Sequence, residues 1–130
     1  MALNEILINP TRKTYDVLII GGAMLGSSVA WFLSKNNDFR GSILVVEKDP
    51  TYEFTSTAHT NSCMRQQFST EINIKISQFG ADFVKNFRHY MGGDERIPDI
   101  PFHQYGYMYL ANNQIFAKIL KDEQILQKKC

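Results

Sequence analysis

Two short apolar runs, with an amphipathic stretch between them, form the pattern of the first third of the chain. Residues 15–20 and 42–46 are nearly continuous apolar runs, as expected for parallel strands that are covered on both faces. Residues 24–35 carry apolar side chains at helical spacing and end before an Asn-Asn-Asp sequence. Strand, helix and strand in this order predict a βαβ unit, whose crossover is right-handed in nearly all proteins.

A longer amphipathic stretch predicts a helix over residues 71–91, with Ser69 or Thr70 as its N-cap and Gly92-Gly93 at its end. The residues of its apolar stripe, which we expect to face a core, are Ile72, Ile76, Phe79, Phe83, Phe87 and Tyr90. The three phenylalanines are therefore interpreted as core residues and not as part of a cofactor site.

Two further elements are predicted after that helix. In residues 104–111, Tyr107 and Tyr109 alternate with Met108 and Leu110, which indicates a strand with two different faces. A last helix is expected to follow, capped by Asn112 or Asn113. Its apolar residues are Ile115, Phe116, Ile119, Leu120 and Leu126.

Length and composition narrow the classes of protein to consider. The chain has 130 residues, of which 44% are hydrophobic and 21% charged, as in a globular protein of one ordinary domain. A formal net charge of +1 argues against a nucleic-acid binder, and no apolar run is long enough to span a membrane. The 2 cysteines do not make a disulfide framework. We expect a cytoplasmic location, with a mitochondrial one as the alternative for a eukaryotic source.

A glycine-rich turn joins the first predicted strand to the first predicted helix. Gly21 to Gly26 follow the buried strand and Glu47 ends the second one, which is the context that a dinucleotide-binding G-x-G-x-x-G motif requires. Gly21 would permit the tight turn, Gly26 would let the helix approach the strand, and Glu47 would accept hydrogen bonds from an adenosine ribose. Because the charge of Glu47 would repel a 2′-phosphate, NADP is disfavoured. The alternative is a glycine-rich turn that binds no ligand.

One position departs from this motif, because Ala23 stands where the middle glycine belongs. An alanine methyl group leaves less room for a pyrophosphate, and a left-handed backbone there would cost roughly 1–2 kcal/mol. We therefore expect either that the phosphate sits further out or that Gly22 takes up the left-handed conformation.

Residues 16–33 and 43–47 resemble the N-terminal FAD-binding signature of the D-amino-acid oxidase superfamily, which includes glycine, sarcosine and dimethylglycine oxidases and dehydrogenases. Two further segments resemble the subgroup of FAD-dependent oxidoreductase domain-containing proteins of type 1. They are Thr55-Ser56-Thr57 and Arg65-Gln66-Gln67-Phe68-Ser69. A third segment, Gly106-Tyr107-Met108-Tyr109-Leu110, resembles the G-Y-L-x-L strand of the superfamily.

The resemblance implies an α/β fold in which a Rossmann-like FAD-binding βαβ unit is followed by helices and the first strand of a mixed-sheet substrate domain. Residues 1–14 would be a leader, residues 15–91 the N-terminal part of the FAD-binding domain, and residues 92–130 the start of an incomplete substrate domain. We therefore expect the chain to be an N-terminal portion of a longer protein. By itself it should bind FAD poorly and show no turnover.

The resemblance also implies which residues bind FAD. Small hydroxyl groups after the second strand would lie against the phosphates, although residues 48–69 could instead be an ordinary solvated loop. The implied cofactor-binding residues are Gly21, Gly22, Ala23, Met24, Leu25, Gly26, Glu47, Lys48, Ser56, Thr57, Asn61 and Ser62. No metal site is predicted.

Arg65 resembles the arginine that holds the substrate carboxylate in amino-acid-oxidising members of the superfamily. The alternative is a loop arginine paired with Glu71. His59 lies where some relatives tether flavin covalently, but the spacing from Ser56 is shorter than theirs, which argues against a covalent bond. Cys63 is interpreted as a loop or packing residue, not as a redox thiol.

The function that the resemblance implies is oxidation of the C–N bond of an amino acid or secondary amine by hydride transfer to FAD, followed by hydrolysis of the imine. The substrate would be a small molecule, and the resemblance does not indicate which electron acceptor reoxidises the flavin. A non-catalytic flavoprotein or assembly partner is one alternative. An NAD-dependent dehydrogenase that shares only the Rossmann half is another.

Overall fold

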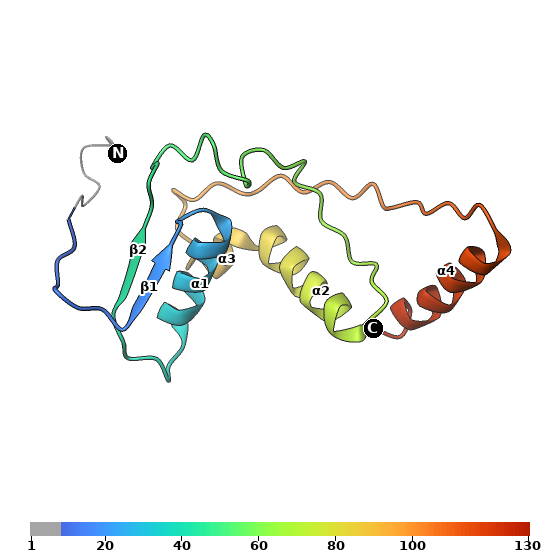
Figure 1. Ribbon diagram of the computed structural model, residues 1–130, viewed down its shortest axis with the longest axis horizontal. Helices are drawn as coiled ribbons and strands as arrows, with labels where there is room; N and C mark the ends of the chain where they lie inside the picture. Colours follow the sequence, from blue (N-terminus) through green and yellow to red (C-terminus); the bar gives the residue numbers. More distant parts are fainter. Residues whose placement is uncertain (1–8) are drawn as a thin grey trace. The chain divides into compact units, whose positions relative to one another are not determined.

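The computed structural model describes residues 9–130 (Figure 1). The chain forms two compact units, one that ends at Ser62 and one that begins at Cys63. Of the predicted leader, residues 1–8 lie outside the described residues. The predicted boundary between residues 91 and 92 concerns the domains of a longer protein and stays a prediction.

The first unit is the predicted βαβ unit. It consists of β1 (Val17–Ile20), α1 (Met24–Lys35) and β2 (Ile43–Val46), with the two strands parallel and hydrogen-bonded to each other. In Figure 1 the helix lies along the two strands, as in a crossover connection. The mixed α/β class is confirmed, and each strand is one or two residues shorter than its apolar run. The register pairs Val17 with Ile43, Leu18 with Leu44, Ile19 with Val45 and Ile20 with Val46.

A polar pair fixes this register where the two strands begin. The Asp16 carboxylate accepts hydrogen bonds from the Ser42 backbone N–H at 2.7 Å and from the Ser42 hydroxyl at 2.8 Å. These bonds, the backbone one first, hold the pKa of Asp16 below its usual value. A one-residue slip would break both bonds and would also move every apolar side chain to the other face of the sheet.

Only one face of the small sheet is covered among the described residues. The γ2 methyl of Ile19 packs against α1 at Gly26, whereas Ile20 on the opposite face is 84% exposed. The prediction that the strands are covered on both faces is therefore wrong for this part of the chain. A single helix can cover one face of a two-stranded sheet, and no second described element lies on the other.

The second unit contains α2 (Glu71–Lys85), α3 (Phe87–Tyr90) and α4 (Gln114–Gln127). The single helix predicted over residues 71–91 is thus interrupted at Asn86. The Asn86 amide donates hydrogen bonds to the Asp82 carbonyl at 3.2 Å and to the Asp82 carboxylate at 2.8 Å. An asparagine side chain that bonds to the backbone in this way competes with the helical pattern, and the Asn86 backbone leaves the helical region at φ −108° and ψ 26°.

The stripe predicted for this helix is buried only in part. The two buried side chains of α2 are Ile74 and Ala81, while the predicted core residues Ile72 and Ile76 are 63% and 60% exposed. The aromatic residues of the stripe pack mainly on one another, and the closest pair, Phe83 and Tyr90, has ring centroids 4.8 Å apart. A stripe can be buried only where another element covers it, and in the first turns of α2 the covered side chain is Ile74, which is not part of the predicted stripe.

The ends of the helices agree better with their predicted caps. Thr70 is the N-cap of α2 and Asn113 that of α4, where the Asn113 side chain accepts a hydrogen bond from the Phe116 N–H at 2.8 Å. After α3, Gly92 and Gly93 adopt left-handed φ values of +89° and +76°. Glycine adopts this conformation without steric cost, which explains why the helix ends there.

The strand predicted over residues 104–111 does not form. A strand requires a hydrogen-bonded partner, and within residues 9–130 nothing pairs with this segment, which runs as an unpaired connection into α4 (Figure 1). The prediction of a first strand of a mixed sheet is therefore wrong for the described residues. None of the described helices is both long enough and apolar enough to cross a membrane.

Candidate functional site

The glycine-rich turn between β1 and α1 is built by two glycines with different roles. Gly21 has a left-handed φ of +98°, and its N–H continues the sheet by donating to the Val46 carbonyl at 2.7 Å. A Cβ on Gly26 would lie 1.8 Å from the Gly21 carbonyl oxygen, so only glycine lets α1 begin so close to the strand. Both packing roles agree with the prediction.

The alanine that departs from the motif causes no backbone strain. Ala23 is the N-cap of α1 with an extended backbone, φ −67° and ψ −167°. Of the two alternatives, a left-handed Gly22 does not occur, since the left-handed residue of the turn is Gly21. Gly22 is instead the buried residue of the turn, and its carbonyl accepts a hydrogen bond from the Ser27 hydroxyl.

Glu47 is held directly against this turn. Its Oε2 atom accepts the Gly22 N–H at 2.7 Å, and its Oε1 atom accepts the Asp49 N–H at 3.0 Å. Hydrogen bonds from these N–H groups, of which the bond from Gly22 has the larger effect, keep the pKa of Glu47 below its usual value. The carboxylate is therefore ionised at neutral pH. A carboxylate has about four lone-pair sites, which leaves acceptor capacity for two hydroxyl groups of a ligand.

These features fit the adenosine diphosphate part of a dinucleotide. A Cβ added at Gly21 would meet nothing within 4 Å, so the turn faces open space. The first N–H groups of α1 have no partner within the helix, and the helix dipole favours an anion beside them. Met24 and Leu25, in that first turn, are exposed. A pyrophosphate at the turn and a ribose at Glu47 would use the donors and acceptors that the unit offers.

The remaining predicted cofactor residues lie in the exposed part of the first unit. Lys48 follows β2, and Ser56 and Thr57 are the central residues of a turn closed by the Ala58 N–H and the Thr55 carbonyl. Further along, Asn61 is exposed and Ser62 has a left-handed φ of 53°. Their contact with a cofactor stays a prediction.

Tyr52 is the residue of this unit that sequence reasoning missed. Its backbone is left-handed at φ 59°, and its hydroxyl oxygen lies 2.9 Å from the point that a Cβ on Gly22 would occupy. An aromatic residue with this φ is rare. No pattern in the sequence indicates it, because tyrosine in a loop is usually extended or helical.

In the second unit, Arg65 lies at a cavity of about 400 Å³. Its Nη1 atom donates to the Tyr109 hydroxyl at 3.3 Å, and its guanidinium carbon lies 4.6 Å from the centre of the Phe68 ring. The alternative pairing with Glu71 is wrong, because Glu71 instead forms an ion pair with Lys75 one helical turn away. In the part of the chain that the structure describes, no carboxylate lies within 4.0 Å of Arg65.

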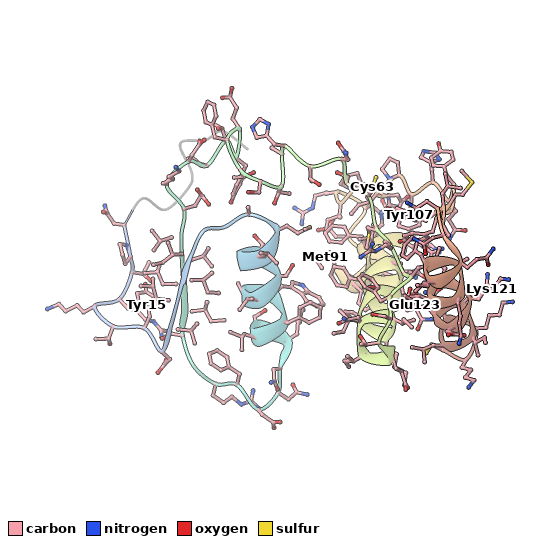
Figure 2. All side chains as sticks on the ribbon, turned by 45° about the vertical axis from the view of Figure 1, so that its right-hand side comes forward. Tyr15, Cys63, Met91, Tyr107, Lys121 and Glu123 are labelled. Atoms are coloured by element: carbon pink, nitrogen blue, oxygen red, sulfur yellow. The ribbon has the colours of Figure 1, made fainter. Side chains whose placement is uncertain are left out.

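The walls of this cavity come from three segments of the second unit. The Gln127 side chain of α4 donates to the Phe68 carbonyl at 3.3 Å and so ties the helix to the Arg65 segment. The pKa of Tyr107 is raised above its usual value, mainly by burial of its side chain and to a smaller extent by the neighbouring Cys63 thiol. Figure 2 labels Tyr107 and Glu123 among the side chains of this unit. The lining residues are Arg65, Gln67, Phe68, Ser69, Tyr107, Tyr109, Leu120, Glu123, Gln124 and Gln127.

Comparison with known proteins gives one family and several relatives. Residues 16–129 match the family described as FAD dependent oxidoreductase. The chain is 39% identical over 119 residues to FAD-dependent oxidoreductase domain-containing protein 1 of Xenopus laevis, covering 88% of this chain and 23% of that protein. The protein of the same name from Bos taurus is 40% identical over 102 residues, which cover 76% of this chain and 21% of that protein.

The Drosophila melanogaster homolog is 39% identical over 114 residues, which cover 88% of this chain and 21% of that protein. The chain therefore spans between a fifth and a quarter of the length of these relatives. No solved structure matches it.

Proposed function

This chain belongs to the FAD dependent oxidoreductase family, and we propose that it forms part of an enzyme that oxidises the C–N bond of an amino acid or secondary amine. In this proposal the first unit holds the adenosine diphosphate part of FAD, and the second unit supplies the group that binds the substrate carboxylate. The substrate is a small molecule.

The cofactor half of the proposal rests on the turn and on Glu47. Backbone N–H groups at Ala23 and Met24 would meet the pyrophosphate, and the ionised Glu47 carboxylate would accept the ribose hydroxyls. Ser56 and Thr57 would add hydroxyl donors from the loop. When bound, FAD supplies the two-electron acceptor for the oxidation of the amine to an imine, which water then hydrolyses.

The single observation that carries the substrate half is the environment of Arg65. The guanidinium lies at a cavity with a phenol and an aromatic ring as neighbours. No described carboxylate lies within 4.0 Å of it, and the acid that lines the same cavity, Glu123, forms no ion pair with it. A planar guanidinium with free donors matches a carboxylate bidentately. An amino acid would therefore be held by its carboxylate, with the α-carbon and the amine left available for oxidation.

Purified intact gene product, meaning the full protein that contains these residues, tests the proposal. We expect flavin absorbance in the holoprotein and anaerobic bleaching of that absorbance by one of sarcosine, proline or a D-amino acid. A holoprotein that none of a panel of amines bleaches would contradict the enzymatic proposal and favour a non-catalytic flavoprotein. A protein that binds NAD and no flavin would contradict the cofactor assignment.

A matched pair of arginine variants tests the role of Arg65. We expect Arg65→Gln to raise the KM for the amino acid by about tenfold or more, because it removes a charged bidentate contact, with flavin content unchanged. Arg96→Gln is the control, since Arg96 is an exposed arginine of the same unit that pairs with Asp94 and does not line the cavity. Equal KM values for Arg65→Gln and wild type would refute the carboxylate role.

A further inference from the structure

Tyr52 combines an unusual backbone with an unusual position. Its φ of 59° is left-handed, a conformation that is unfavourable in free energy for an L residue with a large side chain. Such a conformation is found where the surrounding structure imposes it, often at ligand clamps. The same conformation brings the side chain to Gly22, with the hydroxyl oxygen 2.9 Å from the point where a Cβ would stand. The ring is not enclosed, because Tyr52 is 39% exposed.

A chain of hydrogen bonds connects the Tyr52 backbone to the glycine-rich turn. Glu47, which accepts the Gly22 N–H, also accepts the Asp49 N–H at 3.0 Å. The Asp49 carbonyl then accepts the Tyr52 N–H at 3.1 Å, and the Tyr52 carbonyl accepts the Thr55 N–H at 3.1 Å. The loop is therefore anchored through Glu47, the residue assigned to the ribose, and its geometry depends on the same turn that would receive the cofactor.

The Tyr52 hydroxyl has hydrogen-bonding capacity to spare. A tyrosine hydroxyl has one proton to donate and can also accept. Within residues 9–130 no protein group makes a hydrogen bond with the Tyr52 hydroxyl, although it lies beside Gly22, whose own N–H is already given to Glu47. A neutral O–H donor in this place complements the backbone N–H groups of the turn and does not add to the negative charge of Glu47.

We propose that the Tyr52 hydroxyl donates a hydrogen bond to a phosphate oxygen of the adenosine diphosphate part of FAD. This inference rests on the cofactor assignment made under the proposed function. Tyr52 is then a cofactor-positioning residue, which closes the turn from the loop side while α1 provides N–H donors from the other. The left-handed backbone at Tyr52 is explained as the conformation that directs its side chain toward Gly22.

The affinity of the intact gene product for ADP tests this inference, because ADP carries the diphosphate and lacks the flavin. ADP binding is measured by calorimetry on protein freed of flavin, and FAD binding by the quenching of flavin fluorescence. We expect Tyr52→Phe to raise the Kd for ADP and for FAD by about tenfold, the effect of one hydrogen bond to a charged group. The thermal midpoint of the nucleotide-free protein should not change, since Tyr52→Phe removes no described hydrogen bond.

Tyr15→Phe is the matched control. The Tyr15 hydroxyl accepts the Arg12 N–H at 3.1 Å where the chain enters β1, so its removal should leave both Kd values unchanged. If the wild-type protein binds FAD and ADP, and the Kd values of Tyr52→Phe are within twofold of the wild-type values, the role of Tyr52 is overturned. The proposed function would still stand. Equal weakening in the two variants would also overturn the role of Tyr52, as a general loss of structure. Wild-type protein that binds neither nucleotide would overturn the proposed function itself.

Discussion

Gly26→Ala is predicted to disrupt the first unit although alanine is the best helix former. The new Cβ would stand 1.8 Å from the Gly21 carbonyl oxygen and 3.1 Å from the Ile19 γ2 methyl. Real Cβ contacts are essentially never below 3.0 Å, so the carbonyl must recede by 1.2 Å (3.0 − 1.8). That carbonyl belongs to a turn fixed to β2 by the Gly21 N–H. A movement of that size therefore also strains the sheet.

The magnitude follows from two opposing effects. Overpacking against a backbone atom costs up to about 3 kcal/mol, and the higher helix propensity of alanine returns about 1 kcal/mol. We therefore expect Gly26→Ala to lower the free energy of unfolding by about 2 kcal/mol. Gly80→Ala is the control, because a Cβ there would make only an ordinary 3.5 Å contact with the flexible end of Met64. It should stabilise α2 by about 1 kcal/mol.

Urea unfolding of the 130-residue chain measures both changes. The chain has 1 tryptophan, Trp31 in α1, so its fluorescence reports the first unit, and circular dichroism at 222 nm follows the helices that include α2. Gly26→Ala should shift the fluorescence midpoint to lower urea with the slope unchanged. A fluorescence midpoint equal to that of wild type would refute the argument that the turn and helix are packed too closely for a methyl group.

Two further predictions follow from Glu47 and Asn113. The Gly22 N–H lowers the pKa of Glu47 in the folded state below its ordinary value of 4.5. The stability that this contributes to the folded protein is therefore fully present at a pH above 4.5, and it is lost as the pH falls through the lowered pKa. Stability measured by Trp31 fluorescence should therefore decline less in acid for Glu47→Gln than for wild type, and identical pH profiles would contradict this. Asn113→Ala should cost about 1 kcal/mol of α4 stability through loss of the cap on Phe116, read as reduced helical circular dichroism. Lys118→Ala, at an exposed position of the same helix, is the control and should not lower it.

The elements that the sequence predicted well are those whose signals are local. The bounds of α1 agree with the prediction to the residue, and the caps Thr70 and Asn113 were both among the expected alternatives. At Asn113 the deciding interaction, with the Phe116 N–H, lies within one turn of the helix. The interruption at Asn86 is local too, but asparagine is tolerated within many helices, so the residue type alone does not show which conformation it takes.

The arrangement around the candidate sites required the structure. The contact of Arg65 with Tyr109 joins residues far apart in the sequence, and no periodicity relates them. The approach of Tyr52 to Gly22 depends on a left-handed backbone that a tyrosine rarely adopts. By contrast, the position of Glu47 beside the glycine-rich turn could be predicted, because the end of the second strand lies next to the first turn in a dinucleotide-binding βαβ unit.

Three of the predictions that were wrong share one physical cause. The continuous apolar runs predicted strands covered on both faces, the stripe of α2 predicted a core, and the alternation in residues 104–111 predicted a strand. Each pattern specifies only one side of a contact, namely that a face is apolar or that a backbone is suited to pairing. Burial and pairing also need the second side, and the described residues supply none for Ile20, for Ile72 or for the Tyr107–Tyr109 segment. An apolar pattern is therefore evidence that a surface is suited to burial, and the element that buries it has to be identified separately.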